Sequence, residues 1–543
     1  MKLRNFLSIC LLGASLSMFA QTHAEGVEYF KADQIENAKT LLNRNLNNAG
    51  TDKAVSYYYL GRIAALEGNQ SEAARNYELG AQANPEYPYN YIGLGEIELL
   101  NGNRQVAEKN FKEAENRGKK DPGIHVEIAR AYYNQDPVNN QQIIEKRLQK
   151  ARKINPESVE VYMFEGDVLA NEKNWGSAGT KYEMAANTDP NATGAYVKYA
   201  NLFKRVNPKY SINMLQKLLE ANPASALGQR ELANAYYTNN NYAKAAEEYG
   251  KYVKNPNHFK EDEDRYAFLL FYDQAYQKGY DYATSLLNSN PNNFTARRFQ
   301  FMNAAQIPAL SDKLLPMAEN LYNAHKANPS ANRFAPIDYI LVAEEMKNAK
   351  RIDEAVEVMT EAIKELPDNA SFNKTLSGIY LESGDYDKAA DAYTGYIEKT
   401  ADPSYADILT HALYAYYGGA KQFNDNPEVA NKYFELAKKQ AAKASEMDKS
   451  QYRPYKVLGD IAIAQAPKAE ASSAAEPMYM QAVELIEALP DKSKVANDAK
   501  VIYNYLGNYN LDKKDKEKAK AFFNKYLELD PDNADYRKFV NSL

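Results

Sequence analysis

The sequence predicts an all-α solenoid of helix–turn–helix units, and two observations carry this prediction. The first is a signature that recurs at a spacing of 34 residues in three pairs of like residues: Gly61 and Gly95, Ala73 and Ala107, and Tyr77 and Phe111. Internal repetition at this period is typical of solenoids, in which each unit buries its apolar face against its neighbours. The second is length, because a single core stops growing at about 250–300 residues and this chain has 543.

The first 24 residues have the features of a secretory signal peptide. Lys2 and Arg4 precede an apolar run over residues 6–20, and Thr22-His23-Ala24 offers a cleavage site before Glu25. The run is too short to be a membrane-spanning helix. We therefore expect an exported protein that is periplasmic, associated with the cell envelope or secreted, with a mature chain that begins at Glu25.

The single cysteine, Cys10, leaves a lipoprotein as the alternative. Leu7-Ser8-Ile9-Cys10 resembles a bacterial lipobox, but the branched Ile9 stands where that pattern has a small residue. A plain cleaved signal peptide is therefore favoured. The mature chain would then contain no cysteine and no disulfide.

Each unit pairs two helices through small residues at the point where they cross. In residues 54–85 these are Gly61 and Ala73, and Pro85 ends the second helix. Residues without bulk let two helices approach closely, and proline cannot continue a helix. Each such unit has two small residues, then a large residue and a proline, at the same spacing. This spacing recurs in residues 159–190, 226–256, 336–367 and 370–403 and in a last full unit that ends at Pro531.

This pattern resembles the tetratricopeptide repeat family, which places Leu and a small residue at positions 7 and 8, Ala at 20, an aromatic residue at 24 and Pro at 32. The resemblance covers nearly all of residues 25–543 and gives about 13–14 units. It implies a right-handed superhelix in which the first helix of each unit lines a concave groove.

Several stretches depart from the repeat. Residues 262–330 match the pattern poorly, and we expect a short second helix near residues 283–288 and an irregular segment over residues 306–310. Residues 464–477 are rich in Ala, Pro and Ser and are expected to form an inserted loop. Residues 535–543 are expected to form a capping helix.

No motif of catalysis or cofactor binding occurs in the sequence. The phosphate-binding loop, the dinucleotide-binding fingerprint, the zinc-protease motif and the nucleophile elbow are all missing, and the histidines after the signal peptide are scattered through different units. We therefore expect no enzyme activity, no cofactor and no metal site. The net charge of −6 argues against nucleic acid as a partner. No later stretch is long and apolar enough to predict a transmembrane segment.

The resemblance also assigns candidate binding residues. In the tetratricopeptide repeat family the groove is lined by positions 2, 5, 9 and 12 of each first helix, and Tyr and Arg are common anchors of protein interfaces. The partner-binding residues expected at these positions are Tyr58, Arg62, Tyr89, Ile92, Glu96, Met163, Asp167, Arg230, Asn234 and Tyr237. Members that bind chaperones clamp a carboxylate with repeated Lys and Asn, but the inner residues here are of mixed charge, so this clamp is not expected. Because neither Tyr58 nor Arg62 is a consensus packing position, both are expected to be dispensable for the fold.

The leading hypothesis is a non-enzymatic scaffold of a bacterial cell envelope that docks a protein or peptide in its groove and associates with envelope complexes. The alternative is a glycan-binding outer-membrane protein resembling the SusD-like family. Those proteins usually carry a lipobox, long insertions and tryptophan-rich sugar platforms. This chain has a poor lipobox and one tryptophan, Trp175, which favours the scaffold.

Overall fold

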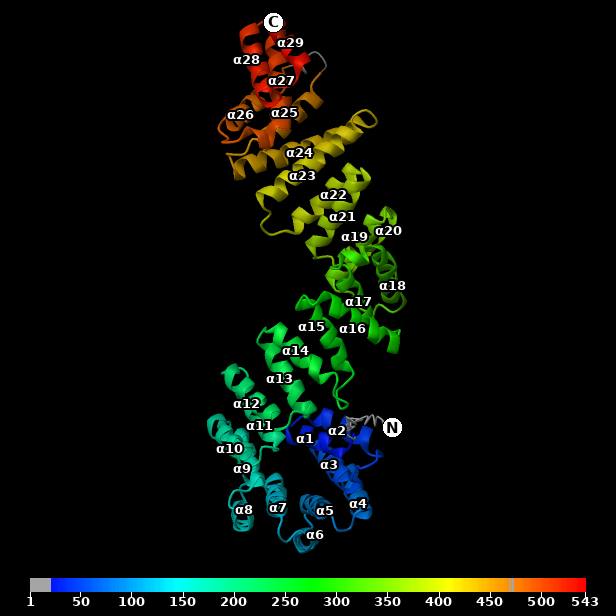
Figure 1. Cartoon of the computed structure of the whole chain (residues 1–543), viewed down its shortest axis with the longest axis vertical. Coiled ribbons are helices and arrows are strands. Elements are labelled where there is room, and N and C mark those ends of the chain that lie inside the picture. Colours follow the sequence, from blue (N-terminus) through cyan, green and yellow to red (C-terminus); the bar gives the residue numbers. More distant parts are fainter. Residues whose placement is uncertain (1–20, 468–469, 471–472) are drawn as a thin grey trace, which may run out of the picture. The chain divides into compact units, whose positions relative to one another are not determined.

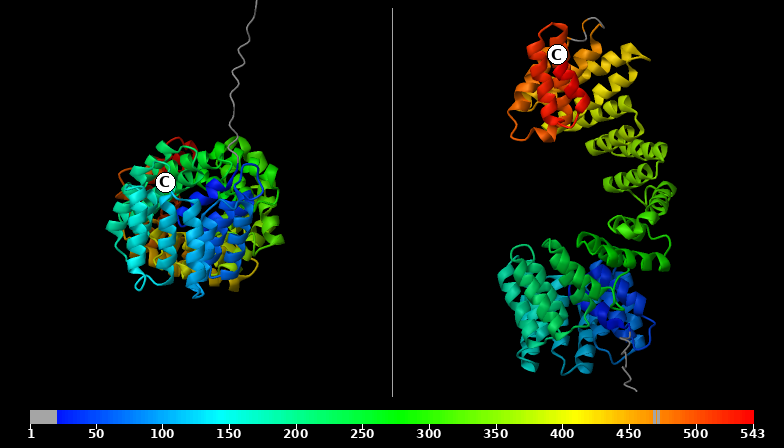
Figure 2. Two further views of the ribbon diagram at one scale, coloured as in Figure 1. Left: turned by 90° about the horizontal axis from the view of Figure 1, so that it is seen from below. Right: turned by 45° about the horizontal axis from the view of Figure 1, so that its top comes forward.

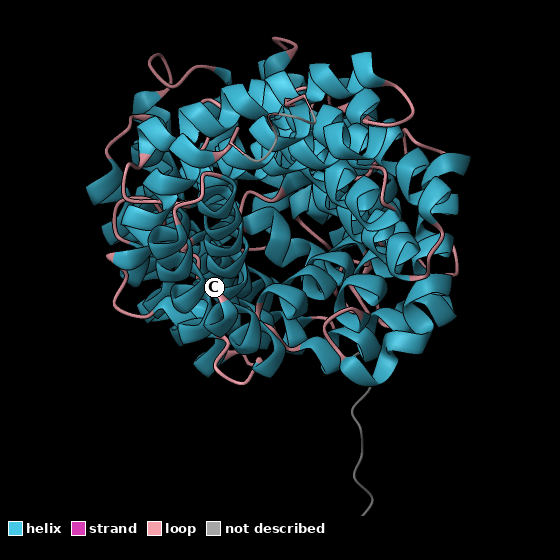
Figure 3. Cartoon of the chain, turned by 90° about the horizontal axis from the view of Figure 1, so that it is seen from above, coloured by secondary structure: helices cyan, strands magenta, loops and turns pink. Residues whose placement is uncertain are grey.

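The computed structural model describes residues 21–467, 470 and 473–543, and all regular structure in them is helical. These residues form 29 α-helices and two short 3-10 segments (Figure 1), and Figures 2 and 3 show the same helical make-up from other directions. The α-helices follow one another as 14 helix–turn–helix pairs, from α1–α2 to α27–α28, and α29 stands alone at the end. The predicted all-α solenoid of helix–turn–helix units is confirmed.

The chain divides into two compact units, and the boundary lies between Ala283 and Thr284. The helices of unit 1 are α1 (His23–Lys31), α2 (Ile35–Asn45), α3 (Lys53–Leu66), α4 (Gln70–Ala83), α5 (Tyr89–Leu100), α6 (Arg104–Arg117), α7 (Pro122–Gln135), α8 (Gln141–Ile154), α9 (Val159–Asn171), α10 (Trp175–Thr188), α11 (Thr193–Phe203), α12 (Pro208–Ala221), α13 (Ala226–Thr238), α14 (Tyr242–Tyr252) and α15 (Glu261–Tyr272). The boundary falls inside α16 (Tyr276–Ser289).

Unit 2 continues with the remaining helices. They are α17 (Phe294–Ala304), η1 (Pro308–Lys313), α18 (Leu314–Ala327), α19 (Pro336–Asn348), α20 (Ile352–Glu365), α21 (Ala370–Ser383), α22 (Tyr386–Lys399), α23 (Tyr405–Gln422), α24 (Pro427–Met447), α25 (Arg453–Gln465), α26 (Glu476–Glu487), η2 (Lys492–Val495), α27 (Ala496–Asp512), α28 (Lys516–Leu529) and α29 (Ala534–Ser542).

Small residues at the helix crossings make room for aromatic rings. A Cβ atom added to Gly61 would overlap the ring of Tyr77, which lies in the second helix of the same pair. Gly166 and Gly507 stand in the same relation to Tyr182 and Phe523. The glycine at position 8 of these repeats is therefore required by the aromatic residue at position 24, because interiors are packed without spare volume.

In most of the helix pairs, the turn between the two helices contains a residue in the left-handed conformation. Glycine supplies it at Gly68 and Gly384, each with φ of 78°, because glycine carries no Cβ penalty there. Lys173 and Lys514 adopt the same conformation with φ of 62° and 63°. These tight turns bring the second helix back along the first, so that the turns within the pairs gather along one edge of the repeats.

The stretches that depart from the repeat are mostly helical. The second helix expected near residues 283–288 is the full-length α16, and the irregular segment expected over residues 306–310 is partly the 3-10 helix η1. The inserted loop lies between α25 and α26, and its residues 468–469 and 471–472 are outside the described part of the chain. The last helix, α29, matches the expected capping helix.

The described structure begins just before α1. Thr22 precedes this helix, and its hydroxyl accepts a hydrogen bond from the backbone N–H of Ala24. The predicted signal peptide, residues 1–24, lies outside the described residues up to residue 20, so its cleavage stays a prediction. In the described residues, no helix combines the length and the apolar character needed to cross a bilayer.

Candidate functional site

The first helix packs against helices far along unit 1. Besides α3, α1 contacts α11 and α13, and Figure 1 shows these helices beside one another. The backbone N–H of Leu227 donates to Oε1 of Glu25 at 3.1 Å, and Nε2 of Gln34 donates to Oε1 of Glu231 at 2.7 Å. The repeats of unit 1 therefore curve until α13 meets α1. As a result, α1 occupies part of the face on which the sequence predicted a groove.

An alternating chain of charges links the first helices of the unit 1 repeats. Arg62 pairs with Glu127, and Arg130 lies 3.3 Å from Glu127 and 3.1 Å from Asp167. Lys198 then reaches Asp167 at 2.7 Å. It also reaches Asp33, in the turn after α1, at 2.8 Å.

Two carboxylates of this chain, those of Glu127 and Asp167, stay ionised although they are half-buried. Burial works to raise the pKa of Glu127, but the guanidinium groups of Arg62 and Arg130 outweigh it and hold the pKa below its ordinary value. Burial also opposes ionisation of Asp167, and Lys198 and Arg130 lower its pKa in the same way. Cations and carboxylates satisfy each other along the whole chain, so it holds the helices together and leaves no net charge for a ligand.

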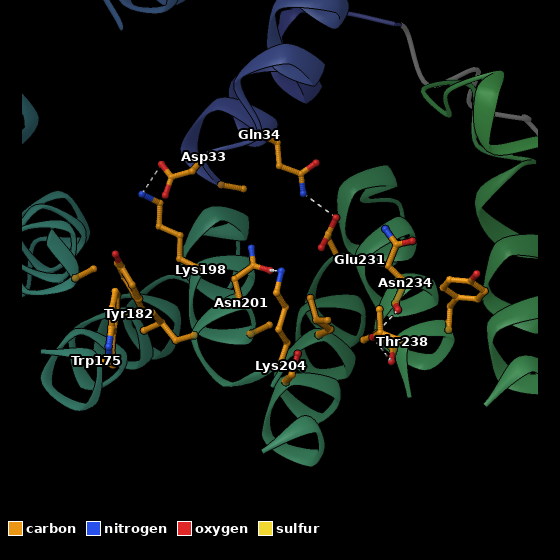
Figure 4. A pocket seen from close by; sticks show the side chains of 18 of the residues that line it. Asp33, Gln34, Trp175, Tyr182, Lys198, Asn201, Lys204, Glu231, Asn234 and Thr238 are labelled. Atoms are coloured by element: carbon orange, nitrogen blue, oxygen red, sulfur yellow. Dashed lines mark hydrogen bonds and ion pairs between the residues drawn. The ribbon is translucent and has the colours of Figure 1, made fainter. Parts of the chain in front are cut away.

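A cavity of about 670 Å³ opens next to the end of this charge chain. Its walls come from the turn after α1 and from α9 to α13, with Arg265 of α15 at one side. Figure 4 shows Trp175, Lys204, Asn201 and Thr238 around it. The cavity lies on the first-helix face of unit 1, and we take it as the candidate binding site.

Two cations at the cavity have no carboxylate partner in the described chain. Nζ of Lys204 donates a hydrogen bond to Oδ1 of Asn201 at 3.4 Å, and the residue is exposed to solvent. The guanidinium group of Arg265 donates to Oδ1 of Asn234 at 3.1 Å and to the hydroxyl of Tyr249 at 3.2 Å, and it lies over the ring of Tyr237. Both cations can therefore form an ion pair with a carboxylate of a ligand.

The predicted site residues of α3 and α5 make contacts within the protein. The hydroxyl of Tyr58 donates to Glu127 at 3.2 Å, and that of Tyr89 donates to Asp121 at 2.8 Å. Glu96 accepts from Nδ2 of Asn134 at 2.7 Å, and Ile92 lies in a hydrophobic core. A role for these residues in partner binding stays a prediction, because they lie away from the cavity.

The expectation that Tyr58 and Arg62 lie outside the packing is wrong. Tyr58 is 2% exposed and its ring packs among those of Tyr59, Tyr77 and Tyr89. Arg62 is nearly buried by its pair with Glu127 and by the ring of Phe30 from α1. Both residues therefore belong to the fold: α1 covers Arg62, and Tyr58 packs among rings of its own repeat and the next.

Four of the five remaining predicted residues lie at the cavity or contact residues that line it. Asn234 and Tyr237 line it. Asp167 and Arg230 contact residues that line it, namely Lys198 and Gln34, the latter at 3.4 Å. Met163 is partly buried against the core on α9.

The sequence analysis did not predict the other residues that line the cavity. They are Ala32, Asp33, Gln34, Ala170, Trp175, Tyr182, Lys198, Ala200, Asn201, Leu202, Lys204, Ser211, Leu215, Glu231, Ala235, Thr238 and Arg265. Asn201 and Lys204 could have been found, because they take positions 9 and 12 if Ala200 is placed at position 8 of its repeat. The contribution of α1 had no signal in the local pattern.

Unit 2 has a smaller hollow of about 310 Å³ on its own first-helix face. It is lined mainly by α27, with Asn504, Asn508 and Tyr509, and by Ile463 of α25. No group of three or more potential metal ligands was found in the described residues of either unit.

Family models for the tetratricopeptide repeat match two parts of the chain. One match covers residues 207–258, which include α12 to α14, and the other covers residues 348–412, which include α20 to α22. No curated protein matches the chain. The repeat signature is thus recognised once in each unit.

Solved structures similar to the chain are also repeat proteins. The C-terminal part of a TPR repeat-containing protein from Cytophaga hutchinsonii is 18% identical; the match covers 51% of this chain and 98% of that one, with a TM-score of 0.41. A tetratricopeptide repeat protein from Parabacteroides merdae is 14% identical, covering 49% and 97%, with a TM-score of 0.32. These similarities are too low to bear on function.

Proposed function

We propose that this chain, which is a tetratricopeptide repeat protein, is a non-enzymatic scaffold that receives a segment of a protein partner in the cavity of unit 1. The repeats themselves make protein interaction the general role. The proposal adds where the partner binds and which chemistry it presents.

The observation that supports this proposal is the set of unused polar groups around the cavity. Lys204 and Arg265 have no carboxylate partner in the described residues, and the Nδ2 atoms of Asn201 and Asn234 have no acceptor there. Amide N–H groups match backbone carbonyls, and the two cations match an acidic side chain or a terminal carboxylate. The partner segment is therefore an extended acidic peptide.

Export to a bacterial cell envelope is part of the same proposal. It rests on the basic start and apolar run of residues 1–20, which are followed by small residues. Recovery of a processed chain from the envelope fraction would support it, and an unprocessed chain in the cytoplasm would contradict it.

The test of the binding site is a comparison of two double variants. Lys204→Gln with Arg265→Gln removes both free cations. The control, Lys217→Gln with Lys254→Gln, removes two exposed cations, one on α12 and the other in the turn after α14. Proteins that the wild type captures from envelope extracts are first identified. Calorimetry then measures the affinity of the wild type and of both double variants for each captured protein.

We expect the cavity variant to lose at least 10-fold in affinity and the control to keep wild-type affinity, because a truncated anchor costs more than about 1–2 kcal/mol. Circular dichroism should show equal helicity in all three proteins. Equal affinity of the cavity variant and the wild type would place the partner elsewhere.

A further inference from the structure

Exposed apolar side chains in unit 1 gather at the turns within the helix pairs. Ten large apolar residues are exposed in residues 21–283, the described part of unit 1. Eight of them lie at or next to such a turn, and the exceptions are Ile154 and Met184. The eight are Leu66, Leu100, Val106, Val138, Trp175, Val206, Tyr210 and Tyr272. In unit 2 the same holds for two of six, Tyr417 and Phe423. The accumulation is therefore a property of unit 1 and not of the repeat.

These turns lie along one edge of the unit. Consecutive first helices pack against each other, as α3 does with α5, α5 with α7 and α7 with α9. Each of these helices runs in the same direction, so their ends, and the turns that follow, line up. Figure 2 shows the blue and cyan helices of unit 1 standing side by side in the left view. We call this row of turns the turn edge.

The turn edge is most apolar and most basic around α9 to α12. Trp175 is 52% exposed, Val206 78% and Tyr210 53%. Trp175 lines the same cavity as Leu202 and Lys204, so the two turns are neighbours.

The neighbouring cations Lys173, Arg205 and Lys209 are exposed, and none has an ion-pair partner in the described part of the chain. The nearest acidic residue in these turns is Glu172. The local charge is therefore positive in a chain whose net charge is −6.

We propose that this part of the turn edge binds the surface of an anionic lipid bilayer. Trp175, Val206 and Tyr210 are exposed beside cations without ion-pair partners, and this combination of apolar and basic side chains suits insertion between anionic lipids. Tryptophan and tyrosine favour the bilayer interface, and exposed basic residues beside them are drawn to anionic headgroups. This lipid contact is a second activity beside partner binding, and it uses different cations.

The position of Trp175 provides a direct test. It is the single tryptophan of the chain, so emission excited selectively at tryptophan reports on this turn alone. The processed chain is mixed with vesicles of equal parts phosphatidylglycerol and phosphatidylcholine, and with vesicles of phosphatidylcholine alone. We expect a blue shift of the emission, protection from acrylamide and flotation with the anionic vesicles, all weakened by salt.

Two variants and a matched control define the surface. Val206→Ser with Tyr210→Ser removes apolar side chains, and Lys173→Gln, Arg205→Gln and Lys209→Gln together remove charge. The control set Lys119→Gln, Lys120→Gln, Lys153→Gln and Ile154→Ser changes exposed cations and an apolar residue on the opposite edge of unit 1. We expect at least a 10-fold loss of vesicle affinity in each variant and none in the control.

Three results would overturn the proposal. They are an unchanged Trp175 emission with anionic vesicles, equal losses in the variants and the control, and capture of an acidic protein through these residues without any vesicle binding. The cavity variant Lys204→Gln with Arg265→Gln should keep vesicle binding, so a failure of the proposed partner site would be seen separately.

Discussion

Arg62 illustrates how a residue on a predicted groove face becomes part of the core. Its ion pair with Glu127 is nearly buried, and Glu127 has one other cationic neighbour, Arg130. Removing one member of a buried pair leaves an uncompensated charge. We therefore predict that Arg62→Ala lowers the free energy of unfolding by about 3 kcal/mol, measured by urea denaturation. Arg75→Ala, which breaks the exposed pair with Glu72, should cost less than about 0.5 kcal/mol. Equal effects would contradict a structural role for Arg62.

Glu25 makes the contact between α1 and α13 sensitive to pH. Burial, and then the like charge of Glu28, raise its pKa to about 8, although the backbone N–H groups of Leu227 and Ala226 and the charge of Arg44 oppose this rise. The folded protein therefore keeps a proton that the unfolded chain releases near its ordinary pKa of 4.5. This contribution to stability is complete below about pH 4.5 and is lost as the pH rises through 8.

The measurable consequence is a difference between the wild type and the Glu25→Gln variant in how the free energy of unfolding depends on pH. For a chain that begins at Gln21, we expect Glu25→Gln to remove about 3 kcal/mol of the pH dependence of the free energy of unfolding between pH 5 and 8. Subtracting the variant from the wild type removes the contributions of His23 and other shared groups. Identical profiles would show that the carboxyl group is solvated in the folded protein.

At the level of the helix pair, the sequence was sufficient because its constraints are local. Gly61 and Tyr77 are 16 residues apart in the sequence, and their contact repeats wherever a glycine precedes an aromatic residue at this spacing. The docking of α1 could not be predicted in this way. It depends on hydrogen bonds such as that from Gln34 to Glu231, which spans 197 residues, and on curvature accumulated over six repeats.

The start of α1 bears on the predicted cleavage site. Nδ2 of Asn45 donates to the carbonyl oxygen of Thr22 at 2.9 Å, and the backbone N–H of Asp52 donates to Nδ1 of His23 at 3.0 Å. Cleavage after Ala24 would remove these contacts together with the helix cap, which is worth about 1 kcal/mol. We therefore predict that the exported chain begins at Gln21, and N-terminal sequencing decides the question. A start at Glu25 would uphold the site suggested by the sequence.

On the scale of the whole molecule, the division into two units determines how damage spreads. Repeats contact mainly their neighbours, so a local defect need not unfold the entire array. Local contacts also explain why the binding site was only partly predicted. Positions 2, 5, 9 and 12 locate the inner face of each repeat. The packing of α1 against α11 and α13 then determines which part of that face stays open. Asn234 and Tyr237 remain at the cavity, whereas Phe30 of α1 covers Arg62.

The final prediction uses Trp175 to follow unit 1 separately. Ala178 and Ala519 are both fully buried at helix crossings, one in unit 1 and the other in unit 2. Leucine at either position overpacks the crossing and should cost about 1–3 kcal/mol. Ala178→Leu should lower the melting midpoint seen by Trp175 fluorescence more than the midpoint seen by circular dichroism, which averages over both units. Ala519→Leu should lower the circular dichroism midpoint and leave the fluorescence midpoint unchanged, because its neighbours lie in unit 2. If both variants shift both signals equally, the two units unfold as one cooperative body.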